Sequence, residues 1–105
     1  MTARVEVRDG AVYLPAALAE TYFRGVDAVV LLIRGGALQV LPVRQAAAGG
    51  CLLKIRNAAG DRVAAAPDLF LAAGLGAWAA QGLEARWSSE AGALVVELPI
   101  QKLQT

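Results

Sequence analysis

The sequence predicts a mainly β (α+β) fold in which two tandem β-β-α-β-β units share one core. Residues 36–43 (GALQVLPV) return as residues 92–100 (GALVVELPI) with one residue inserted, and such self-similarity is typical of a supersecondary unit written twice. Short apolar runs bounded by Gly, Asp and Pro predict strands in both copies. At 105 residues the chain is about one domain, because a lone unit of about 45 residues buries too little surface. Residues 1–105 are therefore expected to form a single domain.

The first unit, residues 4–43, opens with a predicted hairpin. Residues 4–8 alternate charged and apolar side chains, which is the period-2 pattern of a half-buried strand. Asp9-Gly10 predicts a type I′ turn, because both central residues of that turn need positive φ. Residues 12–14 form the expected return strand.

A helix and a second strand pair complete the first unit. Pro15 suits the first turn of a helix, where its missing N–H is not needed, and this helix is expected to run to Arg24. Gly25 can take the left-handed conformation that ends it. Two apolar strands follow at residues 27–34 and 38–43.

The second unit, residues 51–100, repeats this order after a short connector at residues 44–50. Pro67 begins its helix, and Asp68 is favourably placed in the first turn of that helix. Residues 77–82 are an insertion relative to the first unit, and we expect them to form one extra helical turn. Strands are expected at residues 52–56, 62–66, 83–87 and 93–98, with a frayed tail at residues 101–105.

Composition favours a folded cytoplasmic protein. The chain is 57% hydrophobic and 18% charged, which argues against disorder. Its longest strongly apolar run, residues 28–33, is far shorter than the roughly 18 residues that a membrane-spanning helix needs. The N-terminal residues lack the apolar core of a signal peptide, and Cys51, the only cysteine, cannot form an internal disulfide. We expect no contact with a membrane.

The residue inventory argues against an enzyme. The sequence contains no histidine, the commonest general base and metal ligand. Cys51 is either a small buried hydrophobe at a strand start or a reactive thiol, but no histidine or second cysteine is present to activate it. Asp27, at the turn into an apolar strand, is either a turn or capping residue or an acid with a catalytic role. Gly74-Leu75-Gly76 follows a helix instead of opening one, unlike a dinucleotide-binding loop. We therefore expect no catalytic residues, no cofactor and no metal.

The first unit resembles a known family. The pattern Val5-x-Val7-x-x-Gly10-x-Val12-x-Leu14-Pro15-x-x-Leu18, followed by Asp27 and two apolar strands, is similar to the AbrB-type family of swapped-hairpin transition-state regulators and antitoxins. The resemblance covers residues 4–43 well and residues 52–100 loosely. It implies that the two units interlock into one small swapped-hairpin-like barrel with pseudo-two-fold symmetry, as an intramolecular pseudo-dimer.

The resemblance also implies candidate contacts to DNA phosphates. Members of the family bind DNA through basic residues on the first hairpin and the neighbouring loops. Carried over by position, these are Arg4 and Arg8 in the first unit and Lys54, Arg56 and Arg62 in the second. Either these residues contact phosphates, or they form ion pairs with the interspersed acids Glu6, Asp9 and Asp61.

Two functions remain open at this stage. The leading hypothesis is a small, non-enzymatic binding or accessory module that acts through protein–protein contacts with another protein or with itself as a homo-oligomer, because its high apolar content leaves hydrophobic surface. Trp78 is a candidate anchor for such a partner, unless it packs over the end of the barrel. The alternative is a DNA-binding transcriptional regulator, which the net charge of only +1 does not favour.

Overall fold

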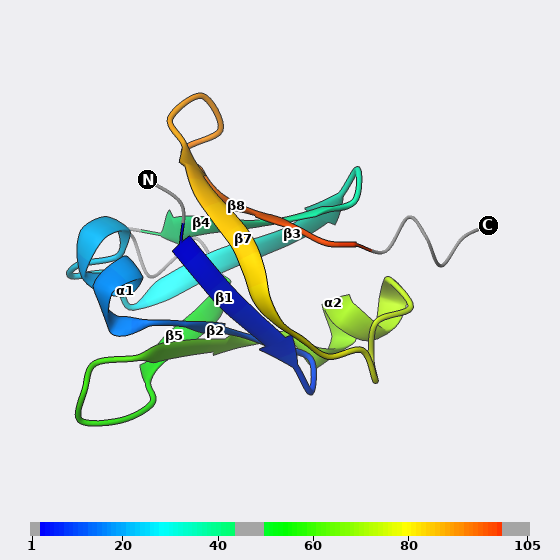
Figure 1. Cartoon of the computed structure of the whole chain (residues 1–105), viewed down its shortest axis with the longest axis horizontal. Helices are drawn as coiled ribbons and strands as arrows, with labels where there is room; N and C mark the ends of the chain where they lie inside the picture. The colour runs from blue at the N-terminus through cyan, green and yellow to red at the C-terminus, as the bar shows by residue number, and fades with distance from the viewer. Residues whose placement is uncertain (1–2, 44–49, 100–105) are drawn as a thin grey trace.

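The computed structural model describes residues 3–43 and 50–99, which form a closed antiparallel β-barrel with two short helices (Figure 1). The mainly β fold is therefore confirmed. Neighbouring strands around the barrel follow the order β1-β2-β6-β5-β3-β4-β8-β7. In chain order the elements are β1 (Ala3–Arg8), β2 (Ala11–Leu14), α1 (Ala16–Tyr22), β3 (Ala28–Arg34), β4 (Ala37–Val43), β5 (Cys51–Ile55), β6 (Arg62–Ala65), α2 (Pro67–Ala72), β7 (Ala80–Ser88) and β8 (Ala93–Glu97).

Alternating strand residues fill the inside of the barrel. Each strand points successive side chains to opposite faces, and the inward set is almost entirely Val, Leu and Ala. The most deeply buried side chains of this set are Val7, Val12, Val29, Leu38, Val40, Leu94 and Val96. No polar or charged residue is fully buried among the described residues, so burial of apolar surface is the main stabilising term.

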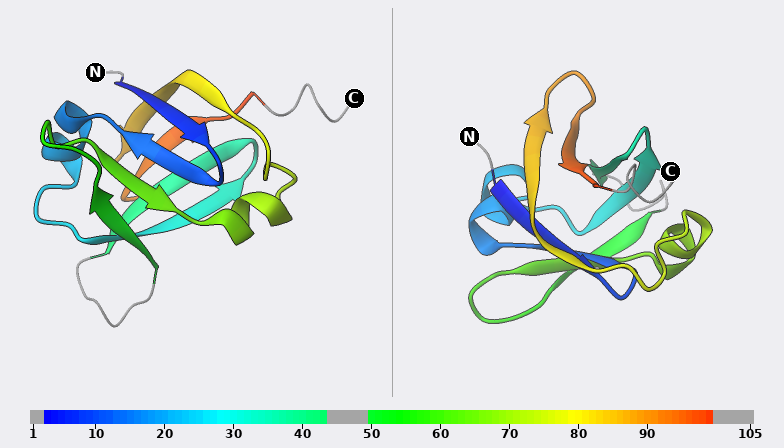
Figure 2. Two further views of the ribbon diagram at one scale, coloured as in Figure 1. Left: turned by 90° about the horizontal axis from the view of Figure 1, so that it is seen from below. Right: turned by 45° about the vertical axis from the view of Figure 1, so that its right-hand side comes forward.

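The two helices close opposite ends of the barrel (Figures 1 and 2). Phe23, which follows α1, and Phe70 of α2 are both completely buried and belong to the single core cluster. At the α1 end, the ring of Tyr22 stacks on that of Trp87 with centroids 5.0 Å apart. At the α2 end, Leu75 and Trp78 join Phe70. Both ends are thus plugged by side chains.

Turn chemistry accounts for the first hairpin. Asp9 and Gly10 have φ values of 53° and 69°, and Arg8 pairs directly with Ala11 across the turn, as the predicted type I′ turn requires. The helix after Pro15 is shorter than predicted, because Phe23 leaves helical geometry. Residues 44–49 of the predicted connector at residues 44–50, and the tail at residues 101–105, lie outside the described residues.

The predicted helical turn at residues 77–82 is wrong. Instead β7 already begins at Ala80 and pairs with β1. The register shifts between Val5, which pairs with Leu83, and Val7, which pairs with Ala80. Gly82 lies in this bulge with a φ of 66°, a conformation that glycine adopts without the steric cost of a Cβ atom. Residues 80–82 of the insertion therefore belong to a strand and form a bulge in it.

The strand pairs keep their pattern when the two halves of the chain are exchanged. If β1 to β4 are renamed β5 to β8, and β5 to β8 are renamed β1 to β4, the same set of strand pairs is obtained. The pair β1–β2 becomes β5–β6, β3–β4 becomes β7–β8 and β1–β7 becomes β5–β3, while β2–β6 and β4–β8 are unchanged. The two seams between hairpins nevertheless differ in extent. The β1–β7 seam reaches from Ala3 to Val7, whereas the β5–β3 seam joins only Cys51 and Leu52 to β3.

Candidate functional site

The outer surface of the barrel carries two faces of different chemistry. The charged face lies over β1, β2, β5 and β7 and the adjoining turns and consists of Arg4, Glu6, Arg8, Asp9, Tyr13, Lys54, Arg56, Asp61 and Glu84. The apolar face lies over β3, β4 and the adjoining parts of β5 and β8 and consists of Ala28, Val30, Leu32, Leu41, Val43, Leu52 and Val95. The strand registers and the burial of the alternate residues define both sets.

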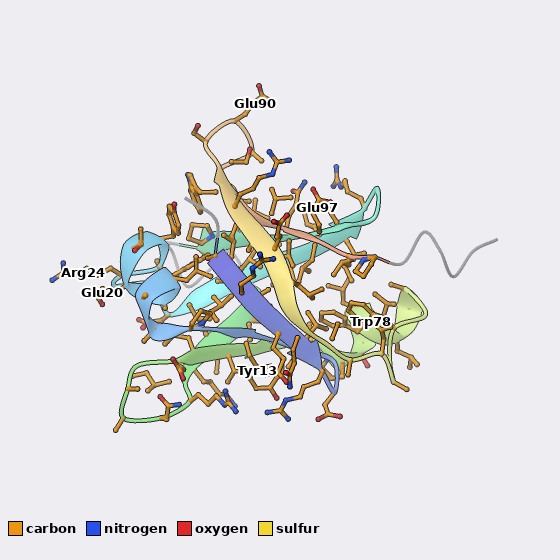
Figure 3. The ribbon with its side chains drawn as sticks, viewed as in Figure 1. Tyr13, Glu20, Arg24, Trp78, Glu90 and Glu97 are labelled. Atoms are coloured by element: carbon orange, nitrogen blue, oxygen red, sulfur yellow. The ribbon has the colours of Figure 1, made fainter. Side chains whose placement is uncertain are left out.

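Tyr13 lies at the centre of the charged face (Figure 3). The guanidinium carbon of Arg8 lies 4.3 Å from the centroid of its ring, and that of Arg56 lies 4.9 Å away. Both distances fall in the range of cation–π attraction. One arginine comes from each hairpin, so the tyrosine links the two hairpins on their outer side.

Ion pairs occupy much of the charge on this face. Arg8 Nε lies 2.9 Å from Glu6 Oε2, and Arg8 Nη1 lies 3.5 Å from Asp9 Oδ2. Arg4 Nη1 lies 3.7 Å from Glu84 Oε1. The basic residues Arg4, Arg8, Lys54 and Arg56 are thus interspersed with the acids Glu6, Asp9, Asp61 and Glu84, which leaves the face close to neutral.

A shallow groove runs between Arg4 and Arg56. Its volume is about 300 Å³, and Glu6, Tyr13 and Asp61 contribute to its lining. Two cationic and two anionic side chains therefore meet around one aromatic ring. Such a groove has no strong preference for an anion, because the carboxylates offset the arginines.

Asp61 has a structural role at the edge of this groove. Its Oδ1 atom accepts the backbone N–H of Ala16 at 2.8 Å, at the start of α1, and its Oδ2 atom accepts a hydrogen bond from Asn57 Nδ2 at 2.9 Å. The Asn57 bond, the Ala16 bond and the nearby charge of Arg56 lower the pKa of Asp61 from its usual 3.8, although partial desolvation opposes them. The carboxylate therefore stabilises the fold in its ionised form.

Arg62 does not lie on the charged face with the other four predicted basic residues. It pairs with the inward-facing Leu14, and its Nη2 atom donates to the carbonyl oxygens of Leu53 and of Val26, the latter at 2.9 Å. Its Nε atom is buried and has no hydrogen-bond partner among the described residues. Arg62 thus bridges β5 to the segment before β3 at the short seam.

Trp78 is half-buried and packs against the core beside α2 (Figure 3). Its backbone N–H donates to the carbonyl of Leu75 at 3.2 Å. This position corresponds to the alternative in which Trp78 packs over the end of the barrel.

Cys51 is also half-buried against the core and pairs with Val29. Within residues 3–43 and 50–99, no three Asp, Glu, His or Cys side chains are grouped so that they could hold a metal ion.

The apolar face is the feature that sequence reasoning missed. Its central pair, Val30 and Leu41, lies on adjacent strands and is partly exposed, and Leu52 at its edge is 64% exposed. None of Val30, Leu32, Leu41, Val43 and Val95 belongs to the set packed against the core. A continuous apolar run such as residues 28–33 does not reveal which side of the strand is covered, and in the structure its even-numbered side chains point outward.

No protein-family model, curated protein or solved structure matches this chain. Among the described residues, neither α1 nor α2 nor any other helix has the length and apolarity needed to cross a bilayer.

Proposed function

We propose that this protein is a small, non-enzymatic binding module that acts through protein–protein contacts made by its apolar face. The supporting observation is the outward row of Val30, Leu32 and Leu41 on β3 and β4. The solvent side of an antiparallel sheet ordinarily carries polar side chains. These three side chains are partly exposed, and a contiguous apolar patch at the surface is typical of an area that another molecule covers.

The charged face supports this proposal indirectly. Its arginines are already engaged with carboxylates and with Tyr13. A ligand that recruited them would first have to replace those contacts. The apolar face has no such internal partners, so covering it removes hydrophobic surface from water at little cost.

We also propose that the scaffold is an AbrB-type swapped-hairpin barrel made intramolecularly from two tandem units. The exchange pattern of the strand pairs supports this, because each hairpin of one half is paired with strands of the other half. A cytoplasmic location is part of the proposal. The single cysteine is consistent with it, because disulfides are characteristic of oxidising compartments.

Site-specific photo-crosslinking tests the protein-binding function. A photoreactive phenylalanine analogue replaces Leu32 on the apolar face, and in a matched control it replaces Val63, an outward and half-buried residue of β6. After irradiation in a lysate of the source organism, mass spectrometry is expected to find a defined protein adduct at position 32 and not at position 63. Equal labelling at both positions, or no adduct at position 32, would contradict the proposal.

DNA binding is the second candidate function, and one observation favours it. Arg4, Arg8, Lys54 and Arg56 come from both hairpins and share the charged face. In this case DNA affinity would fall with rising salt, and would fall further in Arg8→Ala and Arg56→Ala. Arg24→Ala is the control, because Arg24 lies on the α1 side and pairs with Glu20 at 3.4 Å (Figure 3). Absence of binding at low salt would eliminate this candidate.

A further inference from the structure

We infer that a hollow between α1 and the turn from β5 to β6 is a binding site for a small aliphatic monocarboxylate, whose carboxylate group is held by Arg62. This site lies at the α1 end of the barrel, away from the apolar face, and goes beyond the proposed protein-binding function. The lining of the hollow, the unused hydrogen-bond donors of Arg62 and the pairing of the neighbouring acids support the inference.

The hollow lies where the two halves of the chain meet. Its volume is about 380 Å³, which is within the range of small-molecule sites. Ala16, Ala17 and Ala19 of α1 line it, together with Ala59 and Gly60 of the turn between β5 and β6. None of these side chains is larger than a methyl group, so the lining leaves space and presents apolar surface.

Arg62 brings a positive charge with unused donors to this hollow. Its side chain is half-buried and contributes to the lining. Its Nη2 atom already donates to two backbone carbonyls, and its Nε atom is buried. Its Nη1 atom has no hydrogen-bond or ion-pair partner among the described residues, yet it is not one of the buried unpartnered atoms. Nη1 is therefore the guanidinium nitrogen that remains available to a ligand.

The neighbouring acids are engaged elsewhere. Asp61 is held by its hydrogen bonds at the start of α1 and within the turn. Glu20 is the only acid among the described lining residues, and it pairs with Arg24 at 3.4 Å on the outer side of the α1 end (Figure 3). The charges of Glu20 and Arg24 cancel, so Arg62 leaves the hollow with a net positive charge. A partly buried charge without a counterion favours the binding of an ion of opposite sign.

The lining favours a single negative charge and a short alkyl chain. Hydrogen bonds between a guanidinium and a carboxylate are charge-assisted and therefore strong. A dianion such as phosphate would keep one uncompensated negative charge near Glu20. The alanine methyl groups offer apolar contact to an alkyl chain, and the described lining residues include no aromatic ring on which a planar ligand could stack.

Titration with sodium butyrate, followed by ¹H–¹⁵N NMR, tests the inference. Butyrate replaces chloride at a constant ionic strength of about 0.1 M, so the screening of surface charges stays the same. Saturable shifts are expected at the amides of Ala17, Gly25 and Gly60, which line the hollow. n-Butylammonium has the same alkyl chain and the opposite charge, and it should give no saturable shift at these amides.

Four variants test the roles of the lining residues. Arg62→Met should abolish butyrate binding. Ala17→Leu places a larger side chain at an exposed position of α1 and keeps Arg62, so it should weaken binding about tenfold while circular dichroism shows a folded barrel. Glu20→Gln removes the negative charge near the ligand and should strengthen binding. Arg86→Met, on β7 outside the hollow, is the control and should bind butyrate as the wild type does.

The Ala17→Leu variant keeps the test decisive even if Arg62→Met fails to fold. Absence of saturable shifts with butyrate, equal shifts with n-butylammonium, or wild-type affinity in Ala17→Leu overturns the inference. Weaker binding in Glu20→Gln overturns it as well, because the ligand would then depend on the acid. None of these results changes the outcome of the crosslinking test of the apolar face.

Discussion

The carboxylate of Asp61 caps the helix that follows the other hairpin, because its Oδ1 atom accepts the backbone N–H of Ala16 at 2.8 Å. The residue before α1 is Pro15, which has no side chain able to do this. A corresponding contact exists at the opposite end of the barrel, where the carbonyl of Gly10 accepts the N–H of Ala66 at 2.9 Å, just before α2. Each hairpin tip is thus fastened to the start of the helix in the other half.

Removing the Asp61 carboxylate should destabilise the protein in a pH-dependent way. The lowered pKa means that the folded state favours the ionised carboxylate. This stabilisation is complete above the unfolded pKa, which is about 4, and is lost as the pH falls through the lower folded value. Urea unfolding should therefore show a lower free energy of unfolding for Asp61→Ala at neutral pH and a smaller difference near pH 2.

Glu90→Ala provides the control for this experiment. Glu90 is exposed in the turn between β7 and β8 (Figure 3), so its removal should change stability little at either pH. A difference between wild type and Asp61→Ala that stays constant from neutral to acidic pH would refute the capping role of the charged form.

Two glycines with the same backbone conformation should respond differently to alanine. Gly10 and Gly82 have φ values of 69° and 66°, so each substitution brings a strain of about 1 kcal/mol. A Cβ atom on Gly82 would meet nothing within 4 Å, whereas one on Gly10 would lie 2.8 Å from Pro67 Cα. The clash should add about 1–3 kcal/mol for Gly10→Ala. Equal losses in chemical denaturation would show that the hairpin tip is not packed against α2.

Replacement of Arg62 should open the short seam of the barrel. Arg62→Met removes the donor shared by the carbonyls of Val26 and Leu53, which should lower the free energy of unfolding by about 2 kcal/mol. Amide exchange should accelerate at Leu53, whose N–H donates to the Asp27 carbonyl at 2.8 Å. The control Arg86→Met breaks only an exposed 3.9 Å ion pair with Glu97 and should change stability by less than about 0.5 kcal/mol. Unchanged exchange at Leu53 would exclude the bridging role.

The stacked pair at the α1 end should show energetic coupling. Tyr22 and Trp87 lie nearly parallel, with an interplanar angle of 5°, and such aromatic pairs contribute about 1 kcal/mol beyond burial. A double-mutant cycle of Tyr22→Leu and Trp87→Leu should give a coupling energy of that size. A second cycle of Trp87→Leu with Phe70→Leu, at the α2 end, should be additive. Additivity in both cycles would mean that the stack contributes only its buried area.

Local features of the sequence predicted the hairpins and the helix starts well. The residue types of Asp9 and Gly10 themselves favour the positive φ values of the turn, and the backbone geometry of proline marks the helix starts at Pro15 and Pro67. These signals need no knowledge of distant residues. The order of the elements along the chain could therefore be read directly.

The direction of side chains was harder to predict where alternation is absent. Residues 63–66 read Val-Ala-Ala-Ala, so nothing shows that Ala64 faces inward and that Arg62 therefore does too. The apolar face could not be predicted for the same reason. A continuous run of Val and Leu has the same sequence pattern whether one or both sides of the strand are covered by the rest of the protein. Which side is covered depends on the strands and helices that pack there, and these come from distant parts of the chain.

The long seam between β1 and β7 dictates when the barrel can close during synthesis. The strand that contains Val5 can be paired on both edges only after Leu83 has been synthesised. Translation proceeds at only about 5–20 residues per second. For several seconds the first hairpin therefore presents an open strand edge beside apolar side chains, which is the feature that promotes misassembly between nascent chains. Because charged side chains disfavour pairing at an open strand edge, the arginines and acids of β1 are expected to protect the emerging chain before they contribute to the finished surface.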